Sequence, residues 1–100
     1  DQVILLPISD KYQNYSEKVL ESLENSEIRA LVDNRNEKTG RKIRDAEVSK
    51  TPYMIIVGEK EELDGTVSVR KHGEGDIGTF TIEEFISLIK TEESKTLKKF

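Results

Sequence analysis

The chain has 100 residues, of which 34% are hydrophobic and 36% charged, with a net charge of −4. This length suits one small domain with a single core, and the absence of cysteine excludes disulfides and thiolate metal sites. No apolar run approaches the roughly 20 residues that cross a bilayer, so we exclude a membrane role and expect a cytoplasmic location.

The first quarter of the chain predicts a strand followed by a helix. Residues 3–8 (VILLPI) form a short aliphatic run typical of a buried strand. Apolar residues at helical spacing then predict an amphipathic helix that is capped by Ser9 or Asp10 and ends near residue 25. Residues 28–33 (IRALVD) alternate in part and predict a second strand.

The next predicted helix is basic. It is capped by Asn34 or Asn36, and it ends at about Lys50 because Pro52 disfavours a helical residue before it. Residues 35–50 hold six Lys or Arg and three Asp or Glu, a local balance of +3 in an acidic chain. The positive charge is therefore concentrated in one segment.

The second half predicts strands before a final helix. Residues 53–57 (YMIIV) fit a strand that is buried on both faces, and residues 66–70 (TVSVR) alternate as a strand with one polar side. We expect residues 58–65 (GEKEELDG) to form a charged turn. The glycines of residues 72–78 (HGEGDIG) predict a hairpin tip before a short edge strand at residues 79–80.

The last helix begins with a capping box. Thr81 has the side chain of an N-cap, and Glu84 follows three residues later. An apolar face consists of Ile82, Phe85, Ile86 and Ile89.

These elements predict one α/β domain, a three-layer sandwich with a central mixed, mostly parallel sheet of about five strands and about three helices. We expect the domain to cover residues 1–100, with a core at about 3–90 and a charged tail at 91–100.

The sequence gives little support for catalysis. The lone His72 lies in a polar, glycine-rich segment, and no nucleophile motif accompanies it. Residues 73–78 (GEGDIG) lack the strand-to-helix context of a phosphate-binding loop. The adjacent Glu61 and Glu62 are typical of a solvated turn.

RNA recognition has better support. Reading unpaired bases requires hydrogen-bonding side chains on a rigid platform, beside positive charge that holds the phosphates. Asn36, Lys38, Lys50 and Arg70 offer such groups. The alternative is that the basic helix is an ordinary solvated face.

Four sequence strings are more specific than the composition. They are RNEK (35–38), GRKIR (40–44), PYMIIVG (52–58) and GTVSVR (65–70). Together they resemble the C-terminal anticodon-binding domain of bacterial-type threonyl-tRNA synthetases, which are class II aminoacyl-tRNA synthetases. The resemblance covers residues 3–89. The prolyl, glycyl and histidyl enzymes share the general layout, whereas RNEK and TVSVR are similar to the threonyl branch.

The resemblance implies recognition of the threonine anticodon, whose second and third bases are G and U. The positions that it implies for base contacts are Asn36, Lys38, Lys50, Glu61 and Arg70. The charge count of the basic segment adds Arg35, Arg41 and Arg44 as an expected supporting basic face. Lys50 stands where some relatives are expected to have arginine, and lysine lacks the planar fork of arginine. Asn36 could instead be a helix cap, Glu61 a turn residue and Arg70 a member of a cross-strand ion pair. We expect Asn36 and Arg70 to share one surface.

The resemblance also sets expectations for the parent enzyme. ATP, magnesium and zinc would bind in a catalytic domain outside this chain, so the chain alone should be non-catalytic and bind no cofactor. Expected partners are threonine tRNA, the rest of the synthetase chain and a second copy in a homodimer, but not DNA or a membrane. Alternatives are a related class II synthetase, a protein-interaction or dimer-supporting module, and a flavodoxin-like domain. A flavodoxin-like domain would need a glycine-rich phosphate loop after the first strand, and this sequence lacks one there.

Overall fold

A computed structural model describes residues 2–97, with side chains described for residues 2–92. The elements are β1 (Val3–Pro7), a 3₁₀ turn (Asp10–Tyr12), α1 (Gln13–Asn25), β2 (Ala30–Val32), α2 (Thr39–Val48), β3 (Tyr53–Val57), α3 (Glu59–Asp64), β4 (Thr66–Lys71), β5 (Gly75–Thr81) and α4 (Ile82–Leu97). Residues 98–100 of the predicted tail lie outside the described residues, and α4 extends into the rest of it.

The strands form one mixed five-stranded sheet in the order β2-β1-β3-β4-β5. β1 pairs in parallel with β2 and β3, whereas β4 pairs antiparallel with β3 and β5. This confirms the predicted α/β fold with a central mixed sheet. The parallel part is the β2-β1-β3 half, because helical crossovers connect only those strands.

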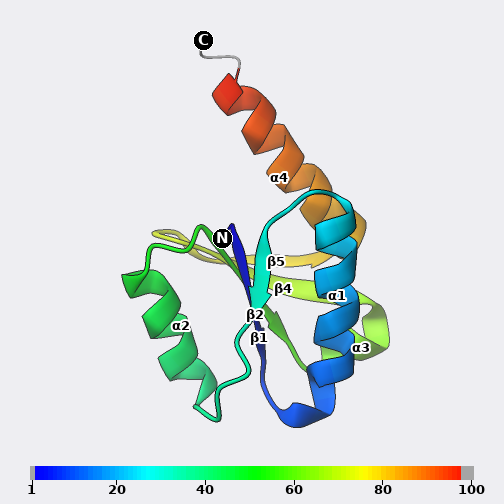
Figure 1. The fold of residues 1–100 in the computed structure, drawn as a ribbon, viewed down its shortest axis with the longest axis vertical. Coiled ribbons are helices and arrows are strands. Elements are labelled where there is room, and N and C mark those ends of the chain that lie inside the picture. The colour runs from blue at the N-terminus through cyan, green and yellow to red at the C-terminus, as the bar shows by residue number, and fades with distance from the viewer. Residues whose placement is uncertain (1, 98–100) are drawn as a thin grey trace.

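Helices cover both faces of the sheet, as Figure 1 shows. α1 and α4 lie on one face over the larger core, in which Leu5, Ile55, Val69 and Phe85 are fully buried. α2 lies on the other face, over a smaller core of Leu6, Ala46 and Met54. Neighbouring residues of β1 and β3 serve opposite cores because side chains alternate along a strand.

The segment 58–65 is a helix rather than the predicted charged turn. α3 occupies Glu59–Asp64 between two glycines, and Gly65 ends it in the left-handed conformation, with φ 70°. Three glutamates lie in its first turn, where the helix dipole favours negative charge. β5 is also longer than the predicted two-residue edge strand.

The predicted caps of α2 are wrong. The N-cap is Lys38, which makes no side-chain capping hydrogen bond. Asn34 instead accepts a hydrogen bond from Gln13 Nε2 at 2.8 Å, and Asn36 lies in the loop before the helix. By contrast, Thr81 and Glu84 form the predicted reciprocal capping box, with bonds of 3.1 and 2.8 Å.

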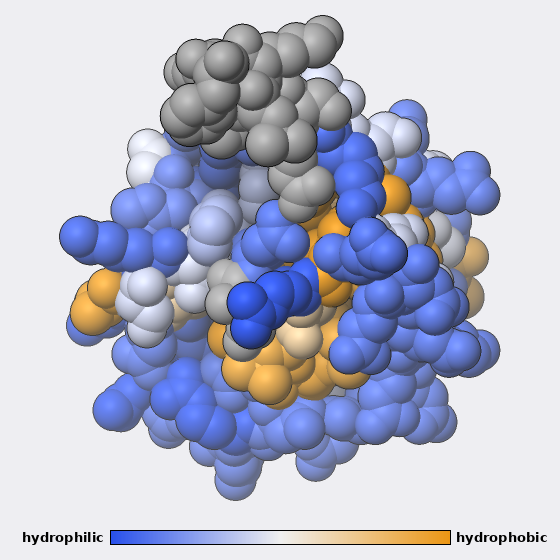
Figure 2. Space-filling model, turned by 45° about the horizontal axis from the view of Figure 1, so that its top comes forward, coloured by the Kyte–Doolittle hydropathy of each residue, from blue (hydrophilic) through white to orange (hydrophobic). Residues whose placement is uncertain are grey.

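The surface is largely polar. In the view of Figure 2 most of it is hydrophilic, and the largest group of hydrophobic atoms lies near the centre. Among the described residues, no helix has the length and apolar character that a membrane span requires.

Candidate nucleic-acid interface

One face of the sheet is only partly covered. α2 packs on β1, whereas β4 and β5 on the same side present Ser68 and Thr79, a cross-strand pair that reaches solvent. Ile56 of β3 lies opposite Ser68 and is half-buried. We call this surface, made by Ile56, Ser68, Arg70 and Thr79, the open sheet face.

Arg70 projects from the open sheet face. Its neighbours Val69 and Lys71 point to the α4 side, and its strand partner is Met54 of the smaller core. Its Nε is buried and has no hydrogen-bond partner among the described residues. Asp76 lies opposite Arg70 on β5, but no ion pair joins the two, and Asp76 Oδ1 accepts from Gly78 N at 2.8 Å. The cross-strand ion pair left open by the sequence is therefore absent here.

Glu61 lies at the carboxyl end of β3. Its Oε1 accepts a hydrogen bond of 2.7 Å from Gly58 N, which is half of a capping box because glycine has no side chain to complete it. A Cβ at Gly58 would approach Ile8 Cδ1 to 2.7 Å and Glu61 Oε1 to 3.3 Å. Ile8 and the Glu61 carboxylate therefore meet over Gly58, at the carboxyl end of β3. Glu61 Oε2 makes no hydrogen bond to another described residue.

The remaining predicted contact residues lie at the two ends of α2. Asn36 and Lys38 are exposed just before α2, and Lys50 is exposed just after it. Asn36 makes no side-chain hydrogen bond to another described residue, so both its donor and its acceptor are available.

The five residues form two groups. Asn36, Lys38 and Glu61 lie at the carboxyl end of the parallel strands, whereas Lys50 and Arg70 lie at the amino end of β3. A five-residue strand spans about 17 Å. One base cannot contact both groups, but several unpaired nucleotides can lie across them.

Ion pairs occupy part of the predicted basic face. Arg35 pairs with Asp33 at 2.9 Å and with Asp45 at 3.0 Å, and Arg41 pairs with Glu37 at 3.1 Å. Among the described residues, Lys38, Arg44, Lys50 and Arg70 on this side make no ion pair. Lys42 makes none either, but it is buried and its Nζ donates to the Asp33 carbonyl. A count of charges in the sequence does not reveal which of them are already paired.

The Asp33 ion pair makes stability depend on pH. Hydrogen bonds from Arg35 hold the pKa of Asp33 below its ordinary value. Because the folded-state pKa is the lower one, this stabilisation is present above the unfolded-state pKa of about 4 and is lost as the pH falls through the folded-state pKa. We expect Asp33→Asn to lower the melting temperature at pH 7, and the difference from the unsubstituted chain to shrink below about pH 4. A constant difference down to pH 2 would contradict this assignment.

Lys50 has an unusual backbone conformation. Its φ is 59°, and the hydrogen bonds Lys50 N to Glu47 O and Thr51 N to Ala46 O close α2 with a Schellman motif. Glycine is the usual residue at this position, because other residues pay roughly 1–2 kcal/mol in the left-handed region. Lysine at this position therefore makes the fold less stable than glycine would.

This geometry gives a matched pair of substitutions. We expect Lys50→Gly to stabilise the fold by up to about 1 kcal/mol while weakening RNA binding. Glu27 has φ 63° in the same motif at the end of α1, where Ile28 N donates to Leu23 O. Glu27→Gly should therefore stabilise the chain without changing RNA affinity. Thermal melts and filter binding test both variants, and equal RNA affinity of the two would remove Lys50 from the interface.

The structure adds two residues beside the predicted contacts that sequence reasoning did not single out for binding. Ile8 is 50% exposed beside Glu61, and Thr79 extends the polar row of Ser68. Only the pairing register of β4 with β5 shows that Thr79 belongs here. Among the described residues, no three His, Cys, Asp or Glu side chains are arranged to hold a metal ion.

Comparison with known proteins assigns the chain to a family. The model of the family described as "Anticodon binding domain" matches residues 2–92. The threonine–tRNA ligases of Flavobacterium psychrophilum and Bacteroides fragilis are 60% and 54% identical over all of this chain. The chain spans 16% of the length of each of these relatives.

A solved structure has the same fold. It is the RNA binding domain of threonyl-tRNA synthetase from Cryptosporidium parvum Iowa II, with a TM-score of 0.84 and 25% sequence identity. The match covers 90% of this chain and 23% of that one. With the family model matching nearly the whole chain, we conclude that this chain belongs to the anticodon binding domain family.

Proposed function

We propose that this chain binds the anticodon loop of threonine tRNA on behalf of a threonine–tRNA ligase of which it is one domain. The observation that carries the proposal is the open sheet face together with the ends of α2, where hydrogen-bonding side chains lie near Lys38, Arg44, Lys50 and Arg70, none of which makes an ion pair with another described residue. Identities of 54–60% with threonine–tRNA ligases favour the threonyl enzyme over its prolyl, glycyl and histidyl relatives.

Each group has a role that its chemistry permits. The Asn36 amide both donates and accepts, so it can match the edge of an unpaired base. Glu61 Oε2 can accept from the N–H groups of guanine, and the Arg70 guanidinium can donate two parallel bonds to a base or a phosphate. Lys38, Arg44 and Lys50 supply point charges for phosphates.

In this proposal, another part of the ligase carries out aminoacylation. ATP, magnesium and zinc would be held by the remainder of the ligase, and this domain would select the tRNA and hold it there. The parent enzyme would be cytoplasmic and would form a homodimer. Sedimentation of the full-length gene product tests the homodimer.

The proposal is tested by filter binding of the full-length gene product to anticodon stem-loops of threonine tRNA. Replacing the central G of the anticodon should weaken binding by roughly 5- to 150-fold, which corresponds to about 1–3 kcal/mol. A stem-loop with exchanged stem base pairs and an unchanged loop is the control and should bind as before. Equal affinity for the two anticodons would refute the proposal.

A further inference from the structure

The loop between β2 and α2 holds Asn36 although it contains no regular secondary structure. Residues 33–38 have few backbone hydrogen bonds, of which Asp33 N to Leu5 O at 2.9 Å and Glu37 N to Arg35 O at 2.9 Å are examples. A loop of this kind is mobile unless side chains anchor it, and mobility would lower its affinity for a base.

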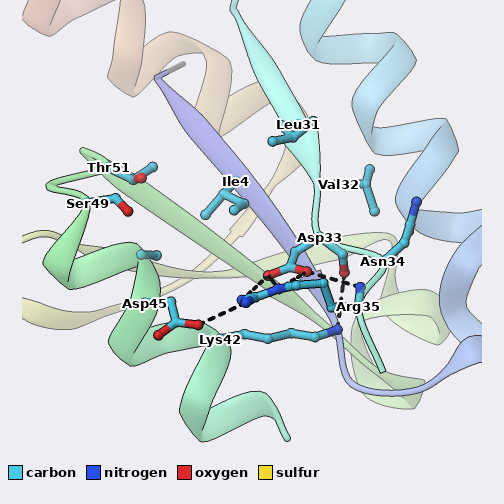
Figure 3. A pocket seen from close by; sticks show the side chains of 11 residues that line it. Ile4, Leu31, Val32, Asp33, Asn34, Arg35, Lys42, Asp45, Ser49 and Thr51 are labelled. Carbon is cyan, nitrogen blue, oxygen red and sulfur yellow. Dashed lines mark hydrogen bonds and ion pairs between the residues drawn. The ribbon is translucent and has the colours of Figure 1, made fainter. Parts of the chain in front are cut away.

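Side chains anchor the start of this loop, as Figure 3 shows. Arg35 Nε donates to both carboxylate oxygens of Asp33, at 3.0 and 3.2 Å, and Arg35 Nη2 donates to Asp33 Oδ2 at 2.9 Å. The opposite edge of the guanidinium reaches Asp45 of α2 at 3.0 Å. One planar group thus ties the end of β2 to the middle of α2.

Lys42 adds a second tie from the same helix. Its side chain is buried, and its Nζ donates to the backbone carbonyl of Asp33 at 3.1 Å. Asp33 Oδ1 also accepts from Arg35 N at 3.1 Å, which fixes the backbone turn at the start of the loop. The loop is therefore held at Asp33 and Arg35, while the next residue, Asn36, is exposed and makes no side-chain hydrogen bond to another described residue.

We infer that the Arg35 guanidinium, clamped between Asp33 and Asp45, is a positioning group that presents Asn36 to the anticodon. The inference rests on the proposed function and adds residues that contact no RNA themselves. It also changes the role of Arg35, which the sequence had placed among the cations that face the phosphates. Because two carboxylates already hold this guanidinium, its contribution to binding comes through the loop.

Arg35→Lys separates geometry from charge. Lysine keeps the unit charge but has no planar fork, so it cannot hold two carboxylates in this arrangement. We expect the full-length gene product carrying Arg35→Lys to bind the threonine anticodon stem-loop about tenfold more weakly and to lose part of its preference for the central G. Arg29→Lys, an exposed arginine before β2 without an ion pair to another described residue, is the control and should change neither quantity.

A double-mutant cycle with Asn36→Ala tests whether Arg35 acts through Asn36. If it positions Asn36, Arg35→Lys should cause no further loss of affinity once Asn36 is alanine. An equal loss in both backgrounds, or no loss in either, would overturn the inference. If thermal melts show that Arg35→Lys does not fold, Asp45→Asn removes only the outer contact and is judged by the same criterion.

The two proposals fail in different ways. If the unsubstituted protein shows no preference for the central G, the proposed function fails and the inference falls with it. If that preference is present and the cycle is additive, only the positioning role of Arg35 is lost.

Discussion

Phe85→Ala should lower the free energy of unfolding by about 3–5 kcal/mol, which is a large part of the stability of a small domain. Phe85 is fully buried, and its ring packs edge-on against Tyr53, with centroids 5.6 Å apart and planes at 84°. It anchors α4 to the sheet, so its removal leaves a cavity between the two layers. Urea denaturation followed by circular dichroism measures the loss.

Two substitutions on the same helix control for this result. Phe85→Leu retains most of the volume and should cost clearly less, and Ser87→Ala changes an exposed position and should cost little. A loss below 1 kcal/mol for Phe85→Ala would mean that α4 does not pack on the sheet as described.

Arg70→Ala should weaken binding of the threonine anticodon stem-loop by about 1–3 kcal/mol while leaving stability nearly unchanged. The reason is that the Arg70 guanidinium has no ion pair among the described residues, although its Nε is buried. Removing the guanidinium therefore breaks no ion pair within the described residues. Filter binding and urea denaturation of the same preparations separate the two effects.

The adjacent residue provides a matched control. Lys71 points to the other face, where its Nζ pairs with Glu74 at 3.2 Å and with Glu92 at 2.8 Å. Lys71→Ala should therefore affect stability rather than RNA affinity. If Arg70→Ala destabilised the fold and left affinity unchanged, Arg70 would be a structural residue.

The main elements of the fold follow from local patterns in the sequence. The run YMIIV is almost wholly apolar because β3 lies in the middle of the sheet with a core on each side. TVSVR alternates because only one side of β4 is fully covered. The reciprocal bonds of Thr81 and Glu84 are likewise local, so residue types and spacing suffice to predict them.

Other features depend on contacts between distant parts of the chain. α3 lacks an apolar periodicity because none of its residues is buried, and its segment therefore resembled a charged turn. Asn34 is occupied by Gln13, which lies 21 residues earlier, so it does not cap α2. The pairing of Arg35 with Asp45 also requires the folded geometry, which is why charge counting assigned Arg35 to the phosphate-binding face.

The central claim is that RNA binds on the side of the sheet that carries α2 and the open sheet face. Backbone amide chemical shifts of the isotope-labelled chain, measured during titration with the threonine anticodon stem-loop, test this most directly. We expect the largest changes at residues 36–38, 48–51, 61 and 68–70, with little change along residues 82–91 of α4. Changes confined to α4 and α1 would place the RNA on the opposite face and contradict the account.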